Sequence, residues 1–494
     1  MKRTVFTAIA IVASAFSTRL CAENYDLTLE QSIVIAKEKS YTMQNLMHEL
    51  KIAEYNLQSA KRQLKTHVDM ELTLPSFDQT VRQYADVIDF YTVHRLTLSS
   101  GLTINQPLPT DGNIFVQSGL AAYRDYYDGN TITSNLNTRI GFRQPLDLLY
   151  GYSSIRVAIK NAELAYERAN KTLQRNELSM VAQVSNSYYN LLMSQKSSEI
   201  ARMNLDRQTE AYEISKNKYE AGLIREVDAL QMEVDLAEAQ SNYDAALLSQ
   251  NSSTNSFKEL IGIELSDSVS LSSELIYKPV FVDADHAVQL ALDNRTELRE
   301  EEIAAELILL DVKRQQLNGR IRGNFNAYIE KVGTASSTTD MRIPNSVQSS
   351  YEHFMNAPVS YGVGFTVSIP IFDWGENRSL VRAAQTRYKQ SLLSRENTRR
   401  DIETEVRNLA ANVSSSLKRL QLLEKNIAVA EKSFEITLQR YTDGDIDSQA
   451  LALERNRLNT ARTSHLSAYI SYQMALTNLM RATFYDFSKD APAN

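Results

Sequence analysis

The chain has 494 residues, 43% of them apolar and 23% charged, and its formal net charge is −7 at pH 7. This composition is too hydrophobic for a disordered chain, and the negative charge gives no reason to expect a nucleic-acid partner. Only 15 glycines and 9 prolines punctuate the chain. Turns are therefore few, and the composition predicts long helices in place of several ordinary globular domains.

Residues 1–22 are typical of a secretory signal peptide. Lys2-Arg3 precedes an apolar run from Val5 to Phe16, and the pattern predicts cleavage after Ala22 and export from the cytoplasm. The mature chain would then carry 50 basic and 60 acidic residues and no cysteine, so it could form no disulfide. A lipid-anchored Cys21 is the alternative, which the bulky Leu20 just before it disfavours.

The remaining sequence contains one pattern twice. The separation between matching landmarks falls from 252 residues (Lys61 to Lys313) to 225 (Pro145 to Pro370), so the first copy holds about 27 extra residues between Lys61 and Pro145. We interpret residues 23–265 as the first repeat, 266–282 as a linker, 283–485 as the second repeat and 486–494 as a tail. The landmarks are Leu29–Ala36 with Ala284–Ala291, Lys61–Gln63 with Lys313–Gln315, Gln144–Leu146 with Ile369–Ile371, and Tyr219–Gly222 with Tyr441–Gly444.

Each repeat contains long amphipathic helices. In the second, apolar residues from Ile402 to Ile427 recur at spacings of three and four. One helix from Tyr152 to Tyr219 would extend about 100 Å at 1.5 Å per residue, and Gly222 and Gly444 are the expected hairpin turns. A plain coiled coil would explain these helices equally well.

Four segments with a period of two predict strands and argue against a plain coiled coil. A further pair of alternating stretches, Leu96–Gln106 and Ile114–Tyr123, predicts an inserted hairpin at about residues 90–125. One apolar and one polar face fits a membrane β-barrel, although a half-buried soluble sheet has the same pattern. Phe372 and Trp374 at the end of the last strand favour a membrane interface. The four core segments lie at Val68–Leu74, Leu136–Phe142, Ile321–Ile329 and Tyr361–Ile369.

The duplicated order of helix, two strands and a long helix pair, with Gln144-Pro145-Leu146 after a strand and Lys218–Gly222 at the hairpin, resembles the TolC family of outer-membrane efflux proteins. The resemblance implies an α+β membrane protein in the outer membrane that extends into the periplasm. It implies a homotrimer that shares a β-barrel of four core strands per chain, continued by a long α-helical barrel. It also implies a periplasmic adaptor (membrane fusion) protein and an inner-membrane pump as partners, and outer-membrane lipid around the barrel. The cargo does not follow from the sequence.

The resemblance also assigns residues to the periplasmic gate. Asp228 and Tyr441 match two members of the family's polar link, but Ile446 stands where an Arg is expected. Ala450 and Leu453 replace the family's acidic constriction. Instead Asp443, Asp445 and Asp447 crowd the turn, so we expect either an acidic rim at the entrance or, more simply, turn residues with Asp447 as a helix cap.

We expect the inserted hairpin on the extracellular side, because the helices must occupy the periplasmic side of the barrel, with a polar and aromatic loop tip at Tyr123 to Tyr127 together with Asp125 and Asp128. Loops on that side of a membrane barrel are normally the longer ones.

Signatures of catalysis are missing from the sequence. It contains no nucleophile elbow, phosphate-binding loop or dinucleotide fingerprint, and the six histidines are too scattered for a local zinc motif. We therefore expect no enzyme activity, no cofactor and no metal. An export channel is the preferred interpretation, ahead of a secreted or periplasmic coiled-coil scaffold or adhesin and of a periplasmic enzyme.

Overall fold

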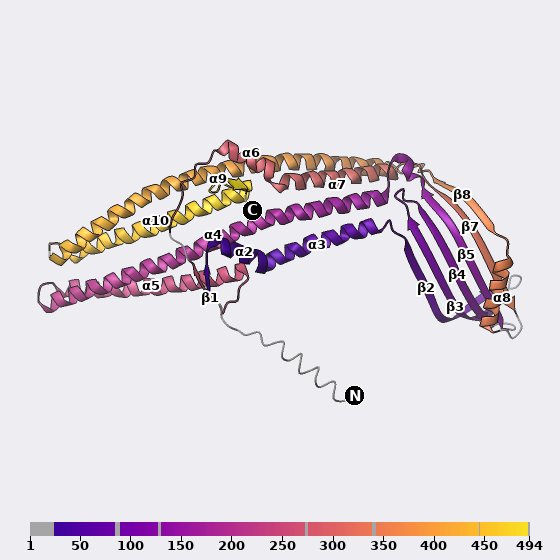
Figure 1. Ribbon diagram of the computed structural model, residues 1–494, viewed down its shortest axis with the longest axis horizontal. Coiled ribbons are helices and arrows are strands. Elements are labelled where there is room, and N and C mark those ends of the chain that lie inside the picture. Colours follow the sequence, from indigo (N-terminus) through magenta and orange to yellow (C-terminus); the bar gives the residue numbers. More distant parts are fainter. Residues whose placement is uncertain are drawn as a thin grey trace, which may run out of the picture. The chain divides into compact units, whose positions relative to one another are not determined.

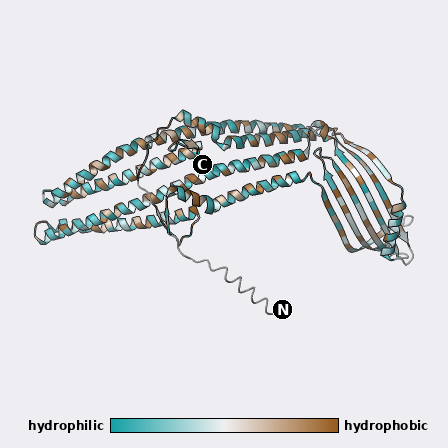
Figure 2. Cartoon of the chain, viewed as in Figure 1, coloured by the Kyte–Doolittle hydropathy of each residue, from teal (hydrophilic) through white to brown (hydrophobic). Residues whose placement is uncertain are grey.

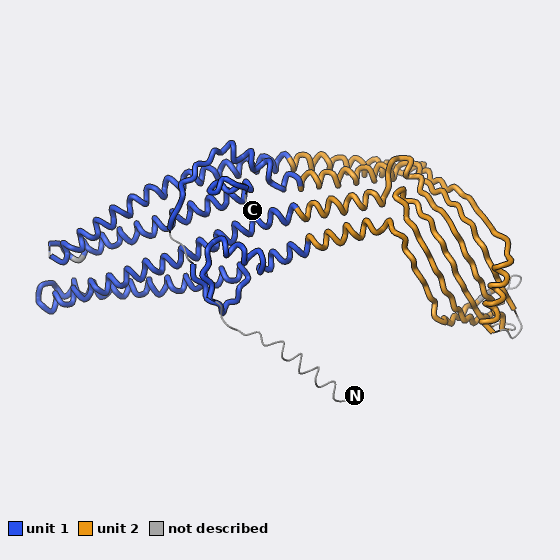
Figure 3. Tube along the Cα trace, in the orientation of Figure 1, with its two compact units in different colours: residues 1–49, 171–299, 396–494 blue, residues 50–170, 300–395 orange. Residues whose placement is uncertain are grey.

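A computed structural model of the chain describes residues 24–83, 89–126, 130–271, 275–337, 342–443 and 445–492. The predicted signal peptide, including Cys21, lies outside these ranges. The described residues form two compact units (Figure 3). Unit 1 draws on residues 1–49, 171–299 and 396–494, and unit 2 on residues 50–170 and 300–395. Both predicted repeats contribute to both units, because the unit boundaries fall inside helices.

Long helices dominate the chain (Figure 1). The helix expected from Tyr152 to Tyr219 is confirmed as α4, one helix of 67 residues, and α9 has 68 residues. None of the helices in the described residues is both long enough and apolar enough to cross a membrane. The helices of more than 20 residues are α3 (Tyr41–Arg62), α4 (Ser154–Glu220), α5 (Glu226–Ile261), α7 (Thr296–Asn318), α9 (Glu376–Asp443) and α10 (Ser448–Thr483).

Unit 1 also contains short strands and short helices. Strand β1 (Asn24–Leu27) pairs in parallel with β6 (Ser268–Leu271), and the short helices α2 (Leu29–Lys39) and α6 (Ala284–Asn294) follow in their respective halves. Strand β6 lies in the segment interpreted as a linker. Near the C-terminus β9 (Tyr485–Asp486) pairs with β10 (Ala491–Pro492). Apolar side chains such as Phe257, Val406 and Tyr472 are buried in this unit.

Unit 2 is built on one antiparallel sheet of six strands in the order β2-β3-β4-β5-β7-β8. The expected pairing of the two inserted stretches is observed, since Gln106 of β3 lies opposite Ile114 of β4. These two strands are full members of the sheet, between β2 and β5. The strands are β2 (His67–Gln83), β3 (Phe90–Pro107), β4 (Asn113–Asp125), β5 (Thr131–Pro145), β7 (Arg322–Ser337) and β8 (Ser360–Ser368).

The pairing of neighbouring strands aligns residues into rows across the sheet, and two adjacent rows are uniform, one apolar and one polar. Hydrophobic and hydrophilic residues alternate along the strands, as Figure 2 shows. Because successive side chains point to opposite faces, adjacent rows give the sheet one apolar and one polar face. One row is Val68, Ile104, Val116, Ile140, Ile329 and Tyr361; the next is Asp69, Thr103, Gln117, Arg139, Glu330 and Ser360.

The expected position of the inserted hairpin at the end of the sheet remote from the helices is wrong. Its turn, Leu108 to Gly112, lies beside the start of α4, because the carboxylate of Asp111 accepts hydrogen bonds from the backbone N–H groups of Ser154 and Ile155. The hairpin therefore runs the whole length of the sheet, in two strands of 18 and 13 residues.

The segment Tyr123 to Tyr127 is strand as far as Asp125, which lies opposite Thr131 of β5, so the connection between β4 and β5 begins at Tyr126. Tyr123 and Asp125 belong to β4, where Arg95 binds the Asp125 carboxylate at 2.6 Å and lies over the Tyr123 ring. The ion pair and the ring contact extend the strand to Asp125. Tyr127 and Asp128 lie outside the described residues.

Asp111 is a helix cap supplied by a neighbouring hairpin. It has a left-handed backbone (φ 65°) and also accepts a hydrogen bond from Ser153 Oγ at 2.8 Å. Replacing Asp111 by Ala removes the cap and places a residue without side-chain polar groups in the left-handed region, so we expect a loss of about 2 kcal/mol in unfolding free energy. Asp111→Asn keeps an acceptor and tolerates that backbone. Thermal unfolding in detergent measures both, and equal losses would contradict the capping role.

The helix α8 (Ile343–Asn356), which was not expected from the sequence, lies between β7 and β8. It packs on β5 and β7, where the hydroxyl of Ser134 bonds with Ser346 Oγ at 2.8 Å and also contacts Ser350. Gly333 permits the approach, because a β-carbon there would collide with the α8 backbone. Pro344 in the first turn of the helix was the available sequence signal.

Candidate functional site

The two helix hairpins of unit 1 end in turns, and each turn contains a backbone hydrogen bond of the same type. The N–H of Leu223 donates to the carbonyl of Lys218 at 2.8 Å, and the N–H of Asp445 donates to the carbonyl of Arg440 at 2.9 Å. Gly222 has φ +72°, and open space surrounds the position that a β-carbon would occupy there, so its backbone conformation alone favours glycine. Gly444 lies outside the described residues.

Tyr441 occupies the core of the second hairpin and contacts the first. It is only 5% exposed and belongs to an apolar cluster with Phe434, Leu451 and Leu458. Lys218 of α4 places its ammonium 4.5 Å from the centre of the Tyr441 ring and donates a hydrogen bond to the Tyr441 carbonyl at 3.1 Å. Burial raises the pKa of Tyr441, and the charge of Asp228 adds to the rise. The hairpins are thus joined by a cation held on a buried aromatic ring.

Asp228 has a partner that was not singled out from the sequence. Arg225, the N-cap residue of α5, donates two hydrogen bonds of 3.0 Å to the Asp228 carboxylate. These bonds hold the pKa of Asp228 below its ordinary value. The spacing of three residues on one helix turn was the available signal. Ile446, at the position where the resemblance led us to expect an Arg, packs instead against the apolar cluster around Tyr441.

The three acidic residues of the second turn have different positions. Asp447 caps α10, since its carboxylate accepts a hydrogen bond from the Ala450 N–H at 2.9 Å. Asp443 is the last residue of α9, and both Asp443 and Asp445 have exposed side chains. The capping role of Asp447 is therefore confirmed, whereas the acidic rim stays a prediction.

Helices α5 and α10 are linked by an ion pair within a polar cleft. Arg455 donates to the carboxylate of Asp235 at 3.2 Å, and these side chains are only 11% and 15% exposed. The cleft has a volume of about 530 Å³ and is also lined by Asp228 and Gln208. Neither Arg455 nor Asp235 was singled out from the sequence, because the residues come from different repeats and have no local pattern.

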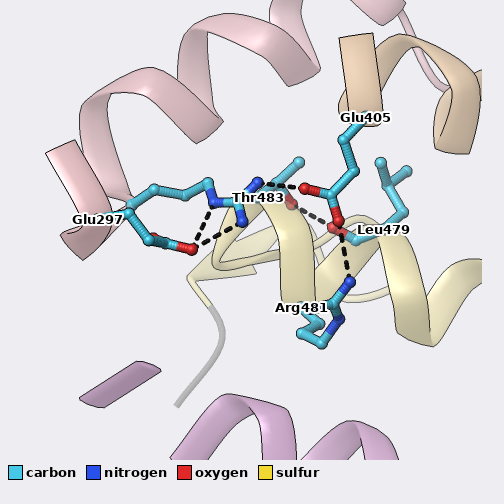
Figure 4. A network of polar contacts seen from close by, with 6 residues as sticks. Glu297, Glu405, Leu479, Arg481 and Thr483 are labelled. Carbon is cyan, nitrogen blue, oxygen red and sulfur yellow. Dashed lines mark hydrogen bonds and ion pairs between the residues drawn. The ribbon is translucent and has the colours of Figure 1, made fainter. Parts of the chain in front are cut away.

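A second, partly buried network of ion pairs links α7 to α9 and α10 within unit 1 (Figure 4). The guanidinium of Arg295 donates to Glu297 at 2.7 Å and to Glu405 at 2.6 Å, and Glu405 also accepts from Arg481 at 3.0 Å. Burial by itself would raise the pKa of Glu297, but the hydrogen bonds and charge of Arg295 hold that pKa below its ordinary value. These ion pairs hold α7, α9 and α10 together at this point, so we interpret the network as structural.

Phe372 and Trp374 follow β8 in unit 2. They are 71% and 90% exposed, and their rings contact each other at 4.5 Å between centroids. Asp373 between them accepts hydrogen bonds from the N–H groups of Gly375 and Asn377 at the start of α9, and these bonds lower its pKa. Aromatic side chains are enriched at membrane interfaces, and the predicted interfacial role of these two exposed rings stays a prediction. In the described part of the chain, no group of three His, Cys, Asp or Glu side chains is arranged to hold a metal ion.

Comparisons with known proteins agree with this architecture. The family model for "Outer membrane efflux protein" matches residues 116–263 and 287–483. The alkaline protease secretion protein AprF of Pseudomonas aeruginosa is 22% identical over 357 residues, which is 70% of each chain. Outer membrane protein TolC of Vibrio cholerae is 22% identical over 366 residues, 71% of this chain and 78% of TolC.

Solved structures show the same fold. The Campylobacter jejuni CmeC outer membrane channel superposes with a TM-score of 0.68 at 14% identity, covering 94% of this chain and 86% of CmeC. The outer-membrane channel OprN superposes with a TM-score of 0.66 at 17% identity, covering 92% of this chain and 89% of OprN.

A sheet with an apolar face joined to helices of 67 and 68 residues is the fold that this chain shares with the solved outer-membrane channels. It belongs to the outer membrane efflux protein family. It is an outer-membrane exit duct of an efflux or secretion system and extends into the periplasm.

Proposed function

We propose that three copies of this chain form one passive duct, with the sheets of unit 2 closing a shared barrel in the outer membrane. The observation that supports a trimer is that the sheet of one chain is open at both edges. Within the described residues, β2 pairs only with β3 and β8 only with β7. Unpaired backbone groups in lipid cost several kcal/mol each, so both edges need a partner strand. Further copies of the same chain supply such strands.

The hairpin turns of unit 1 form the periplasmic entrance in this proposal. Lys218 on Tyr441 joins the two hairpins of one chain, while Arg225 and Asp228 pair on the exposed surface of α5. The exposed carboxylates of Asp443 and Asp445 surround the entrance, where three copies would place them near one axis. Phe372 and Trp374 anchor the periplasmic interface of the barrel.

Cargo reaches the duct from an inner-membrane pump through a periplasmic adaptor. The support is the kind of system in which relatives act: the name of AprF refers to secretion of an alkaline protease, and the family is described by efflux. A duct of this kind performs no catalysis and conducts what the pump delivers.

Mass measurement of the mature protein in mild detergent tests the assembly. We expect a particle of three chains, each of somewhat less than 55.9 kDa, and loss of export when the chain is deleted from its host. A stable folded monomer with intact α4 and α9 would contradict the shared barrel.

A further inference from the structure

The inserted hairpin is a part of the sheet that the proposed assembly cannot leave out. We propose that a second copy of this chain pairs its β2 with β8 of the first, and that three such junctions close a barrel of 18 strands. This inference rests on the proposed trimer and changes its geometry. Four observations support it. They are the strand order, the rows of residues that cross the sheet, the hydrogen bonds that attach the hairpin, and the direction, length and exposed side chains of the edge strands β2 and β8.

The strand order requires β3 and β4 to lie inside the barrel wall. Strand β2 pairs with β3 over fifteen residue pairs and makes no pairing with β5. Strand β4 pairs with β5 over thirteen, which includes Ile114 with Phe142 and Thr131 with Asp125. Removing the hairpin from the wall would break both ladders. Each chain therefore contributes six strands to a closed sheet.

The inserted strands match the faces of the other four. Ile104 and Val116 fill their places in the apolar row that runs from Val68 to Tyr361, and Thr103 and Gln117 fill theirs in the adjacent polar row. A one-residue slip of either strand would exchange its faces. The hairpin thus presents an apolar surface to lipid and a polar surface to the lumen in the same register as its neighbours.

Side chains attach the hairpin to the sheet at its helix end. Asp111 caps α4, and Thr110 Oγ1 donates to Gln144 Oε1 at 2.7 Å. On the other side Gln106 Nε2 donates to the carbonyl of Leu64, just before β2, at 2.9 Å. These contacts reach β5, the start of α4 and the residues just before β2. The hairpin is therefore part of the barrel wall in this proposal and does not project from it.

The two edges are suited to each other. Strand β2 starts and β8 ends beside the helices, so β2 of one copy and β8 of the next run antiparallel. Strand β8 has nine residues and can cover the seven residues of β2 (His67–Thr73) that precede the irregularity near Pro75, where the backbone has no N–H to donate. Both edges carry exposed apolar side chains on the same face, including Met70 at 67%, Val363 at 68% and Phe365 at 68%.

A barrel of 18 strands has a wider lumen than the 12 strands expected from four per chain. Barrel diameter grows roughly in proportion to strand number, so the diameter is about 1.5 times as large and the cross-section about twice as large. The lumen face carries fixed ion pairs such as Arg139 with Glu330 at 2.9 Å. The outer-membrane part of the duct can therefore pass bulky polar cargo.

Engineered disulfides distinguish the two barrels, because the single cysteine of the sequence, Cys21, belongs to the predicted signal peptide. Glu71 lies in one row with Gly101, Gly119 and Asn137, three strands away and thus about 14 Å along the sheet. That separation is too long for a disulfide. A 12-stranded barrel without the hairpin would place β2 beside β5 and allow the link.

In the experiment, cysteine at Glu71 is combined in turn with cysteine at Gly364, Thr366 or Ser368 of β8, and separately with cysteine at Asn135, Asn137 or Arg139 of β5. We expect at least one β8 combination to give linked dimers and trimers that collapse on reduction, and no β5 combination to link within a chain. Asn137→Cys with Val332→Cys, opposite each other in neighbouring strands, is the positive control.

An intrachain link between β2 and β5 in a trimer that still exports cargo would overturn the 18-stranded barrel and leave the proposed function intact. Absence of every link between chains, together with a monomeric mass, would overturn the proposed trimer itself. Electron cryomicroscopy of the unmodified trimer counts the strands directly: six per chain supports the inference, and four contradicts it.

Discussion

Replacing Arg295 by Met lowers the free energy of unfolding by about 3 kcal/mol, the largest stability effect that we expect from a single substitution here. The side chain of Arg295 is 10% exposed and binds the carboxylates of Glu297 and Glu405. Removing one partner of a buried ion pair leaves charge without compensation, which costs about 3 to 5 kcal/mol in well-buried cases. We take the lower end because the Glu405 side chain is 36% exposed.

The loss depends on pH in a defined direction. Arg295 holds the pKa of Glu297 below its ordinary value, so the stability that this carboxylate contributes is complete above the unfolded pKa, about 4.3, and is lost as the pH falls through the folded pKa. The difference between wild type and Arg295→Met is therefore full at about pH 7 and shrinks below about pH 4.3. Thermal unfolding in detergent at a series of pH values measures it.

The matched control is Arg407→Met. Arg407 pairs with Asp285 at 2.9 Å in the same unit, but these side chains are 55% and 75% exposed. Exposed pairs contribute between 0 and about 1 kcal/mol, so this variant stays close to wild type at every pH. Equal losses of unfolding free energy in the two variants, or a loss in Arg295→Met that does not depend on pH, would contradict a stabilising role of the Arg295 ion pairs.

Replacing Asp443, Asp445 and Asp447 together by Asn abolishes the cation preference of the channel, the largest functional effect that we expect. In the proposed trimer, three copies of the turn would bring nine carboxylates near one axis, and rings of Asp favour cations in a pore. Asn keeps most of the turn and capping capacity of Asp, so the fold is retained while the charge is removed. Block by a trivalent cation weakens in parallel. Reversal potentials and single-channel block in planar bilayers measure both effects.

A second triple variant serves as the control and distinguishes the effect of charge at the turn from the effect of charge elsewhere in the chain. Glu54, Glu199 and Glu403 are helix carboxylates away from both hairpin turns, and their replacement by Gln removes the same number of charges. We expect selectivity close to that of wild type. If the Asn variant keeps its selectivity and its block, the three aspartates act only as turn and cap residues, as Asp447 does toward Ala450.

Elements that depend on local pattern could be predicted from the amino-acid order. Apolar spacing of three and four predicted α4 and α9, because a helix buries one stripe of its own residues wherever its partners lie. Alternation predicted the strands for the same reason, and Asp447 at the end of the second turn was expected to cap the last helix. Gly222 predicted a turn, since few other residues adopt its backbone conformation.

Contacts between distant residues could be assigned only from the folded chain. Asp111 caps a helix that begins 43 residues later in the chain, and Arg455 pairs with an aspartate of the other repeat, Asp235. No local period encodes such contacts, because they depend on how strands and helices pack after they form. The same reason explains the main correction: alternation predicted that β3 and β4 form a hairpin, but only their ladders to β2 and β5 placed both strands in the middle of the sheet.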